Sequence, residues 1–167
     1  MLDEAAAGRQ PFDGEFYAEL RHPVLKPDGL AELIGRTDIE WRLFGFPAFV
    51  IEFKILGRNR RTPVYLNEGV VRFVDGRYAR GAAAGAMCAL VRPSLAGVNP
   101  VAELEALIDS APAALRCVPD SLKALRHSPS ALAPVSARFD TVHERDAPRQ
   151  PVRLAHIFLD IPAPSDT

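Results

Sequence analysis

Two runs of alternating apolar and polar residues place the strongest constraint on how this chain folds. The first run covers residues 38–43 and the second covers residues 49–56, with Gly45-Phe46-Pro47 between them. Side chains on a strand alternate between its two faces, so each run predicts a half-buried strand. Glycine and proline suit the connection, because glycine relaxes the backbone and proline cannot donate to a strand ladder. The segment therefore predicts an antiparallel hairpin.

This hairpin places ionisable side chains on one face. The odd-numbered positions of the second run are apolar, and we expect them to form the core. A connection of odd length pairs even positions with even ones, so one face collects Asp38, Glu40, Glu52 and Lys54. The exact register stays open. Ionised groups among apolar residues cost several kcal/mol each, by a rough estimate, unless a partner or a metal compensates them. Such a cost therefore predicts a functional site, where chemistry takes place.

The expected chemistry is metal-assisted hydrolysis of a phosphodiester. Two converging carboxylates repel each other, and a hard divalent cation relieves that repulsion, so we expect Mg²⁺ with Mn²⁺ as a substitute. The ammonium of Lys54 can hold an attacking water or offset charge on a phosphate. The alternative is a set of cross-strand ion pairs on a solvated face, worth about 0–1 kcal/mol each. The apolar neighbours Val50 and Leu56 on the same face favour the site.

Asp38 followed by Glu52-Phe53-Lys54 on an apolar strand resembles the PD-(D/E)xK nuclease superfamily, with Thr37 where that motif usually has proline. The resemblance covers about residues 29–91. It implies a restriction-endonuclease-like α/β (mixed α+β) fold, with a central mixed sheet, a hairpin that carries the site, and flanking helices. It also implies that Asp38, Glu52 and the backbone carbonyl of Phe53 hold the metal and that Lys54 is the catalytic lysine.

Several further residues are candidates for accessory roles. Many members of the superfamily add a glutamate from a preceding helix, and Glu32 is the nearest candidate, followed by Glu19. Glu40 is a further candidate ligand, but an exposed acid on a strand is at least as good an interpretation of it. Tyr65 and Arg72, on a helix expected after the hairpin, are accessory candidates, although packing is the better explanation for Tyr65. His143 and His156 are expected to be structural or surface residues.

The remaining elements follow from periodicity and capping signals. We expect helices at residues 15–20, 30–34, 63–79, 100–111 and 119–126, and strands at residues 84–91, 135–143 and 152–161. Asn99 and Pro100 mark the start of the fourth helix. The 167 residues predict one domain at 29–161, after a partly irregular lead-in at 1–28 and before a flexible tail at 162–167.

Composition limits the function classes. The chain has 48% hydrophobic and 25% charged residues, which is typical of a globular protein. It has two cysteines without ligand spacing, no signal peptide and no apolar run of membrane-helix length, so we expect a cytoplasmic protein without membrane contact. The net charge of −1 does not by itself indicate a nucleic-acid binder, because such domains tend to be basic. A basic loop after the hairpin, with Arg58, Arg60 and Arg61, is the candidate for holding a phosphate backbone, and a solvated charged turn explains it equally well.

The sequence therefore predicts a magnesium-dependent nuclease that acts on DNA in preference to RNA, as a homodimer or with a partner protein. The alternative is a catalytically inactive nuclease-like module for binding or assembly in a larger nucleic-acid-processing complex, such as a bacterial or phage defence system. A third option is an unrelated α/β protein that binds a small ligand.

Overall fold

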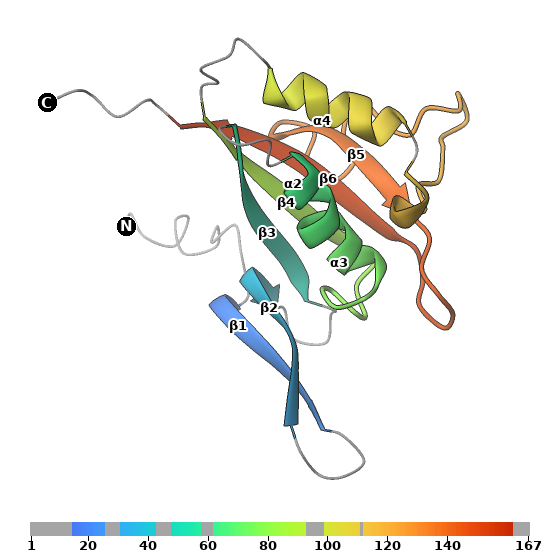
Figure 1. Cartoon of the computed structure of the whole chain (residues 1–167). Helices are drawn as coiled ribbons and strands as arrows, with labels where there is room; N and C mark the ends of the chain where they lie inside the picture. The colour runs from blue at the N-terminus through green and yellow to red at the C-terminus, as the bar shows by residue number, and fades with distance from the viewer. Residues whose placement is uncertain are drawn as a thin grey trace, which may run out of the picture.

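A computed structural model describes residues 15–25, 31–42, 48–57, 62–92, 99–110 and 112–161 of the chain. Its centre is one six-stranded sheet with the strand order β1-β2-β3-β4-β6-β5 (Figure 1). The strands are β1 (Glu15–Leu25), β2 (Ala31–Arg42), β3 (Phe49–Leu56), β4 (Ala84–Val91), β5 (Ala137–His143) and β6 (Val152–Asp160). The helical segments are α2 (Thr62–Tyr65), the π-helical turn η1 (Leu66–Val70), α3 (Val71–Val74), α4 (Pro100–Asp109) and the 3₁₀ turn η2 (Ala113–Leu115). The expected mixed α/β class is confirmed.

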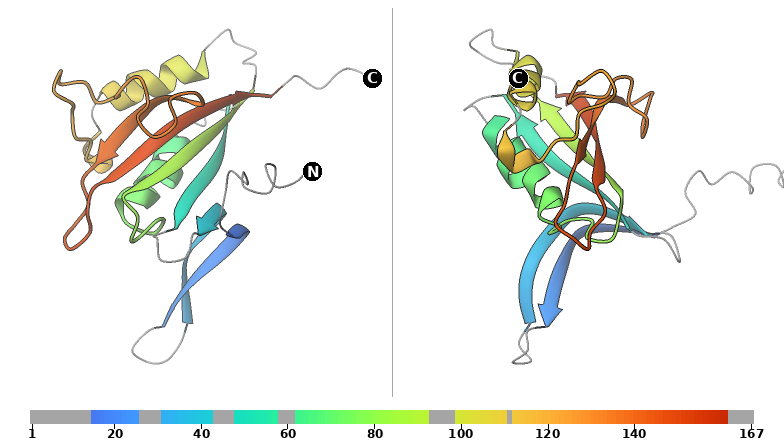
Figure 2. Two further views of the ribbon diagram at one scale, coloured as in Figure 1. Left: turned by 180° about the vertical axis from the view of Figure 1, so that it is seen from behind. Right: turned by 90° about the vertical axis from the view of Figure 1, so that its right-hand side faces the viewer.

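The sheet combines both strand directions. β1–β2, β2–β3 and β5–β6 are antiparallel, whereas β3–β4 and β4–β6 are parallel. The register of β2 with β3 runs from Ile39 opposite Ile51 to Trp41 opposite Phe49, and Glu40 lies opposite Val50. The expected pairing of even with even positions is therefore confirmed. Most of β1 and β2 extends beyond the rest of the sheet as a two-stranded arm (Figures 1 and 2).

The helices lie on one face of the sheet (Figure 2). The consecutive segments α2, η1 and α3 connect β3 to the parallel strand β4, and they bury the apolar stripe expected for this helix, namely Leu66, Val70, Phe73 and Val74. The helix ends at Val74 and not at residue 79 as predicted, because Gly76 adopts a left-handed φ of +71° and its N–H bonds to the carbonyl of Phe73.

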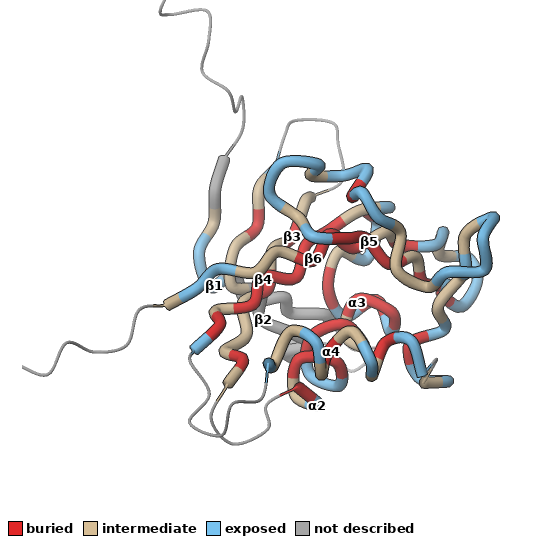
Figure 3. Tube along the Cα trace, turned by 90° about the horizontal axis from the view of Figure 1, so that it is seen from above, coloured by how far each residue is buried: buried red, intermediate tan, exposed pale blue. Residues whose placement is uncertain are grey.

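The buried face of β3 is the even-numbered one, which corrects the expectation that Phe49, Ile51, Phe53 and Ile55 form the core. Those four side chains are half-buried, whereas Val50, Glu52 and Leu56 are at most 2% exposed. Figure 3 shows further buried residues along β4, β6 and α3. The helical crossover has to bury its own apolar stripe, and it does so on the face that also holds the ionisable groups. The site therefore lies inside the packed layer between the helices and the sheet.

Two segments near the N-terminus form strands where we expected short helices, at residues 15–20 and 30–34. Residues 15–20 belong to β1, and residues 31–34 belong to β2. Pro23 is accommodated at a register shift between His22 and Pro23, on a strand at the edge of the sheet. Cross-strand pairing thus prevails over the weak helical spacing of both segments.

The C-terminal half follows the sequence expectations more closely. β4 has the expected bounds, and Asn99 caps α4 by accepting hydrogen bonds from the N–H groups of Val101 and Ala102. β5 begins two residues later than expected, and β6 ends one residue earlier. The helix expected at 119–126 is absent from this described segment. Asp120 instead accepts hydrogen bonds from the N–H groups of Leu122 and Ala124, which diverts both donors from a helix.

The sheet face opposite the helices has a partial cover of irregular chain over β5. Asp140, fully buried there, accepts hydrogen bonds from the hydroxyl of Ser130 and the N–H groups of Ala131 and Leu132. The described helices lie on the other face of the sheet (Figure 2), so the expected flanking helices cover one face only among the described residues. None of the helices in the described part of the chain has the length and apolar character needed to cross a membrane.

Candidate functional site

Asp38 lies where the β1–β2 arm separates from the rest of the sheet. Asp38 directly precedes Ile39, which pairs with Ile51 of β3, and Oδ2 of Asp38 accepts a hydrogen bond of 2.8 Å from the backbone N–H of Phe53. The carboxylate therefore takes the place of a main-chain acceptor of β2 for this N–H group of β3. This contact fixes Asp38 beside the strand that carries Glu52 and Lys54.

Glu52 is the most unusual group of the site, because it is a carboxylate with only 2% of its surface exposed. Its Oε1 accepts hydrogen bonds from Lys54 and from the hydroxyl of Tyr78, whereas Oε2 is buried without a partner among the described residues. Burial raises the pKa of Glu52, the contact with Lys54 lowers it, and the charge of Asp38 raises it further. The effect of burial therefore outweighs that of Lys54, and additional positive charge beside Glu52 would favour its ionised form.

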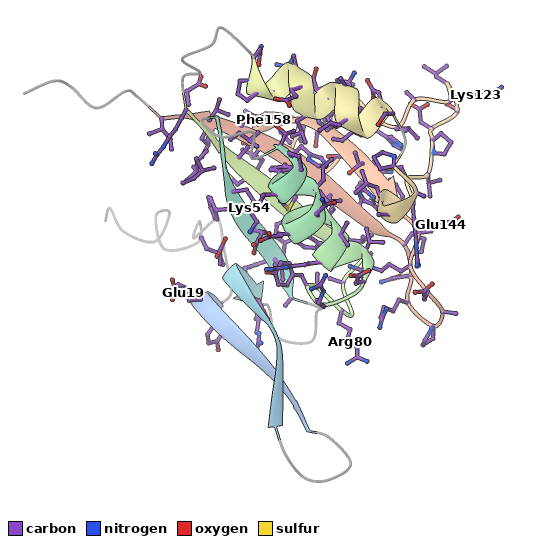
Figure 4. The ribbon with its side chains drawn as sticks, viewed as in Figure 1. Glu19, Lys54, Arg80, Lys123, Glu144 and Phe158 are labelled. Atoms are coloured by element: carbon purple, nitrogen blue, oxygen red, sulfur yellow. The ribbon has the colours of Figure 1, made fainter. Side chains whose placement is uncertain are left out.

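Lys54 lies between β3 and the π-helical turn η1 (Figure 4). A Cβ placed on Gly69 would lie 3.8 Å from Cγ of Lys54 and would overlap the terminal methyl of Met87. The helix therefore approaches the sheet closely at Gly69, and this packing holds the stem of Lys54. The side chain of Lys54 is 17% exposed, and its ammonium forms an ion pair with Glu52.

Tyr78 and Arg72 form a second layer behind Glu52. Arg72 Nη1 donates a hydrogen bond of 2.6 Å to the hydroxyl of Tyr78, which donates to Glu52 over 3.4 Å. Burial raises the pKa of Tyr78, so its hydroxyl stays protonated and remains a donor. Arg72 was an accessory candidate from the sequence, but Tyr78 was missed. The left-handed turn at Gly76, which brings the chain back over the sheet, was its only local signal.

The other accessory candidates lie in varied surroundings. Glu40 is 3% exposed and pairs with Arg42 Nε at 2.6 Å, which contradicts the expectation of an exposed acid. Tyr65 is fully buried, as its packing role requires. Glu19 and Glu32 lie on strands β1 and β2 and not on a helix, because these segments pair with each other. The predicted backbone-binding residues, Arg58, Arg60 and Arg61, lie outside the described residues.

A divalent cation fits part of this arrangement. Oε2 of Glu52 is an oxygen donor without a partner, and the neighbouring Asp38 and the carbonyl of Phe53 are further oxygen donors of the type that Mg²⁺ prefers. No group of three or more His, Cys, Asp or Glu side chains placed to hold a metal occurs among the residues described. A cation here would therefore have two carboxylates, with the carbonyl and solvent as its other ligands.

A separate buried network joins both histidines that we expected to be structural. His143 Nδ1 lies 2.6 Å from the carbonyl of Leu115, and Thr141 Oγ1 lies 2.6 Å from His143 Nε2 and 2.8 Å from His156 Nε2. His156 Nδ1 lies 2.8 Å from the hydroxyl of Tyr65. Burial lowers the pKa of His143 to about 4 and that of His156 to about 3. Neutral rings that are fully hydrogen-bonded indicate a structural role.

Comparison with known proteins identifies no relative of this chain: no family model, no curated protein and no solved structure matches it.

Proposed function

We propose that this protein is a magnesium-dependent nuclease of the PD-(D/E)xK type with a restriction-endonuclease-like fold. The observation that carries the proposal is the buried carboxylate of Glu52, which has one oxygen without a partner beside a second carboxylate, Asp38. Burying such a group costs several kcal/mol, by a rough estimate, unless a cation compensates it. The adjacent ammonium of Lys54 adds the third component of a hydrolytic site.

Asp38, Glu52 and the carbonyl of Phe53 would hold the cation. When bound, it would polarise the scissile phosphate and lower the pKa of a bound water. Lys54 would donate a hydrogen bond to the attacking water or to a phosphate oxygen. Tyr78, itself held by Arg72, would keep Oε1 of Glu52 in place, so that Oε2 points toward the metal position.

The proposed substrate is DNA in preference to RNA, and the proposed compartment is the cytoplasm. The side chain of Arg72 is 31% exposed beside the site, so its guanidinium would be available to contact a phosphate. Arg58, Arg60 and Arg61 would extend this contact along the backbone. Cys88 and Cys117 are free thiols, which accords with a reducing compartment. A homodimer or a partner protein would supply specificity.

The direct test is nicking of supercoiled plasmid with and without Mg²⁺. Glu52→Gln and Lys54→Met should each reduce the magnesium-dependent rate by at least about a hundredfold, because each removes a component that acts on the reacting phosphate. Lys123→Met is the matched control for the lysine, since Lys123 is exposed and distant in sequence. Equal nicking rates in wild type and both site variants, with folding intact, would refute the assignment.

The second candidate is an inactive nuclease-like module that binds or assembles without cutting. The ion pair of Lys54 with Glu52 favours this alternative, because it gives the buried carboxylate a partner without any metal. Calorimetric titration with Mn²⁺ separates the two. The nuclease should bind Mn²⁺ and lose that binding in Asp38→Asn, whereas the inactive module should show no heat from this site.

A further inference from the structure

Arg145 is a buried cation away from the Glu52 site. It follows β5 and has only 8% of its surface exposed. Its Nη1 donates hydrogen bonds of 3.1 Å to the carbonyls of Ala79 and Ala82. Arg145 thereby joins two connections, residues 75–83 between α3 and β4 and residues 144–151 between β5 and β6.

The opposite edge of the same guanidinium has no acceptor. Nε and Nη2, which together form the side-on edge, are shielded from solvent and have no partner in the described part of the chain. The acids next to Arg145 in sequence do not neutralise it: Asp146 pairs with Arg116 at 2.6 Å, and Glu144 lies at the surface (Figure 4). Unpaired buried donors of a charged group cost on the order of 1–3 kcal/mol or more.

A second guanidinium lies close to the first. Arg149, from the 144–151 connection, packs on Gly76, so that a Cβ there would lie 2.7 Å from its Nε and 2.9 Å from its Cζ. Burial, together with the smaller effect of the charge of Arg149, lowers the pKa of Arg145 to about 10. The fold therefore holds two cations near each other, one of them buried, without a carboxylate paired to the buried one.

We propose that Arg145 and Arg149 form a binding site for a phosphate group, separate from the Glu52 site. Nε–H and Nη2–H of Arg145 are the two parallel donors that bind an oxyanion side-on, and a phosphate supplies the negative charge that the buried guanidinium lacks. The Nη1 contacts to Ala79 and Ala82 fix the plane of this fork in advance. This inference goes beyond the proposed nuclease activity and does not depend on it.

The site requires a local movement to admit its ligand. Both free donors are closed to solvent, so an oxyanion reaches them only when the 75–83 or the 144–151 connection shifts. Once bound, it lies in a desolvated position, where its attraction to the guanidinium is much stronger than at the surface. The 75–83 connection also carries Tyr78, which contacts Glu52, so the movement reaches the edge of the candidate active site.

The phosphate could be a free ion or a backbone phosphate of nucleic acid. Isothermal titration with sodium phosphate in EDTA, against sodium chloride of the same ionic strength, tests the shared chemistry. We expect saturable phosphate binding and slower hydrogen exchange in both connections. Arg145→Lys keeps a charge and a donor for the two carbonyls but lacks the side-on edge, and it should weaken phosphate binding at least about tenfold.

Arg149→Gln provides the second variant, because Arg149 is partly exposed and its replacement should leave the fold intact even where Arg145→Lys does not. It should weaken phosphate binding several-fold. Phosphate heats no greater than those of chloride, or wild-type affinity in Arg149→Gln, would overturn the proposal. A short DNA duplex that competes with phosphate and protects the same connections identifies the backbone as the source. Saturable phosphate binding without such competition identifies the free ion, and both results support the site.

Discussion

The hydroxyl of Tyr78 donates a hydrogen bond to Oε1 of Glu52, across 26 residues of sequence and at the buried interface of helix and sheet. The same hydroxyl accepts a hydrogen bond from Arg72, so a neutral group links the guanidinium to the carboxylate. This relationship leaves Oε2 of Glu52 as the oxygen without a partner. It predicts that Tyr78 positions Glu52 and does not itself meet the substrate.

Tyr78→Phe should therefore weaken Mg²⁺ binding about 10- to 100-fold, which is typical for removal of a group that orients a metal ligand. The ring should stay in place, because it packs edge-on against Phe73 with 5.4 Å between ring centroids. The Mg²⁺ concentration for half-maximal nicking and Mn²⁺ calorimetry measure the effect. Tyr65→Phe is the matched control: it removes a buried hydroxyl bonded to His156 and should cost about 1 kcal/mol of stability without changing metal affinity. Equal metal affinity in both variants would contradict the positioning role.

Asp38 has two separable roles, which two substitutions distinguish. Asp38→Asn keeps an oxygen that accepts from the N–H of Phe53, whereas Asp38→Ala leaves this donor without an acceptor. We expect Asp38→Asn to retain the wild-type melting temperature within a few degrees and Asp38→Ala to lose about 1–2 kcal/mol. Both should abolish magnesium-dependent nicking. Thermal denaturation and plasmid nicking measure the two effects, and full activity in Asp38→Asn would remove Asp38 from the metal site.

Gly69 is required by the close approach of η1 to the sheet. In Gly69→Ala the new methyl would overlap the end of Met87, which is fully buried and cannot move into solvent. Overpacking of this kind typically costs about 1–3 kcal/mol, and urea denaturation should show it. Gly81→Ala is the matched control, since its Cβ would meet no atom within 4 Å. Shortening the opposing side chain with Met87→Leu should recover part of the loss in the double variant, and strictly additive effects would disprove the contact.

The sequence predicted the arrangement of the hairpin from local chemistry. The parity argument depends only on strand alternation, and it correctly paired even positions with even ones, so that Asp38, Glu52 and Lys54 share one face; the register itself, with Glu40 opposite Val50, was left open. It could not tell which face the helices would cover. An alternation of Phe and Ile with charged residues favours the apolar side as core, but the crossover helix packs on Val50 and Leu56 instead.

Contacts distant in sequence were beyond the reach of local patterns. Tyr78 meets Glu52 only because the chain reverses at Gly76, and the pairing of β1 with β2 overrides two short segments of helical spacing. The side-on edge of Arg145 has no sequence signal at all, because its significance lies in the partners that the fold fails to provide. Residues of the site that belong to one hairpin were thus predictable, whereas those contributed by other segments were not.

The buried histidine network predicts a loss of stability in mild acid. The carbonyl of Leu115 can only accept, so His143 carries its proton on Nδ1, and its Nε2 accepts from Thr141. Thr141 must then accept from Nε2–H of His156, whose Nδ1 accepts from the hydroxyl of Tyr65. Both rings are therefore neutral, each with one defined tautomer. Nitrogen-15 chemical shifts of the imidazole rings should report Nδ1–H for His143 and Nε2–H for His156.

Protonation of either ring would break this chain of hydrogen bonds, which fixes the sign of the pH dependence. Burial lowers the pKa of His143 to about 4 and that of His156 to about 3, whereas both are near 6.5 when unfolded. Between these values the unfolded chain binds more protons than the folded one. The contribution of the two histidines to the free energy of unfolding is therefore fully present above about pH 6.5. It falls as the pH drops, by up to about 1.4 kcal/mol per pH unit for each histidine. Urea denaturation between pH 7 and pH 5 measures this slope. His156→Phe should reduce it by about half, since Phe139 already stacks on that ring at 4.7 Å and tolerates an aromatic replacement. His127→Gln, at a half-buried histidine without a hydrogen bond to this network, should change the slope much less. A wild-type slope in His156→Phe would show that the acid sensitivity arises elsewhere.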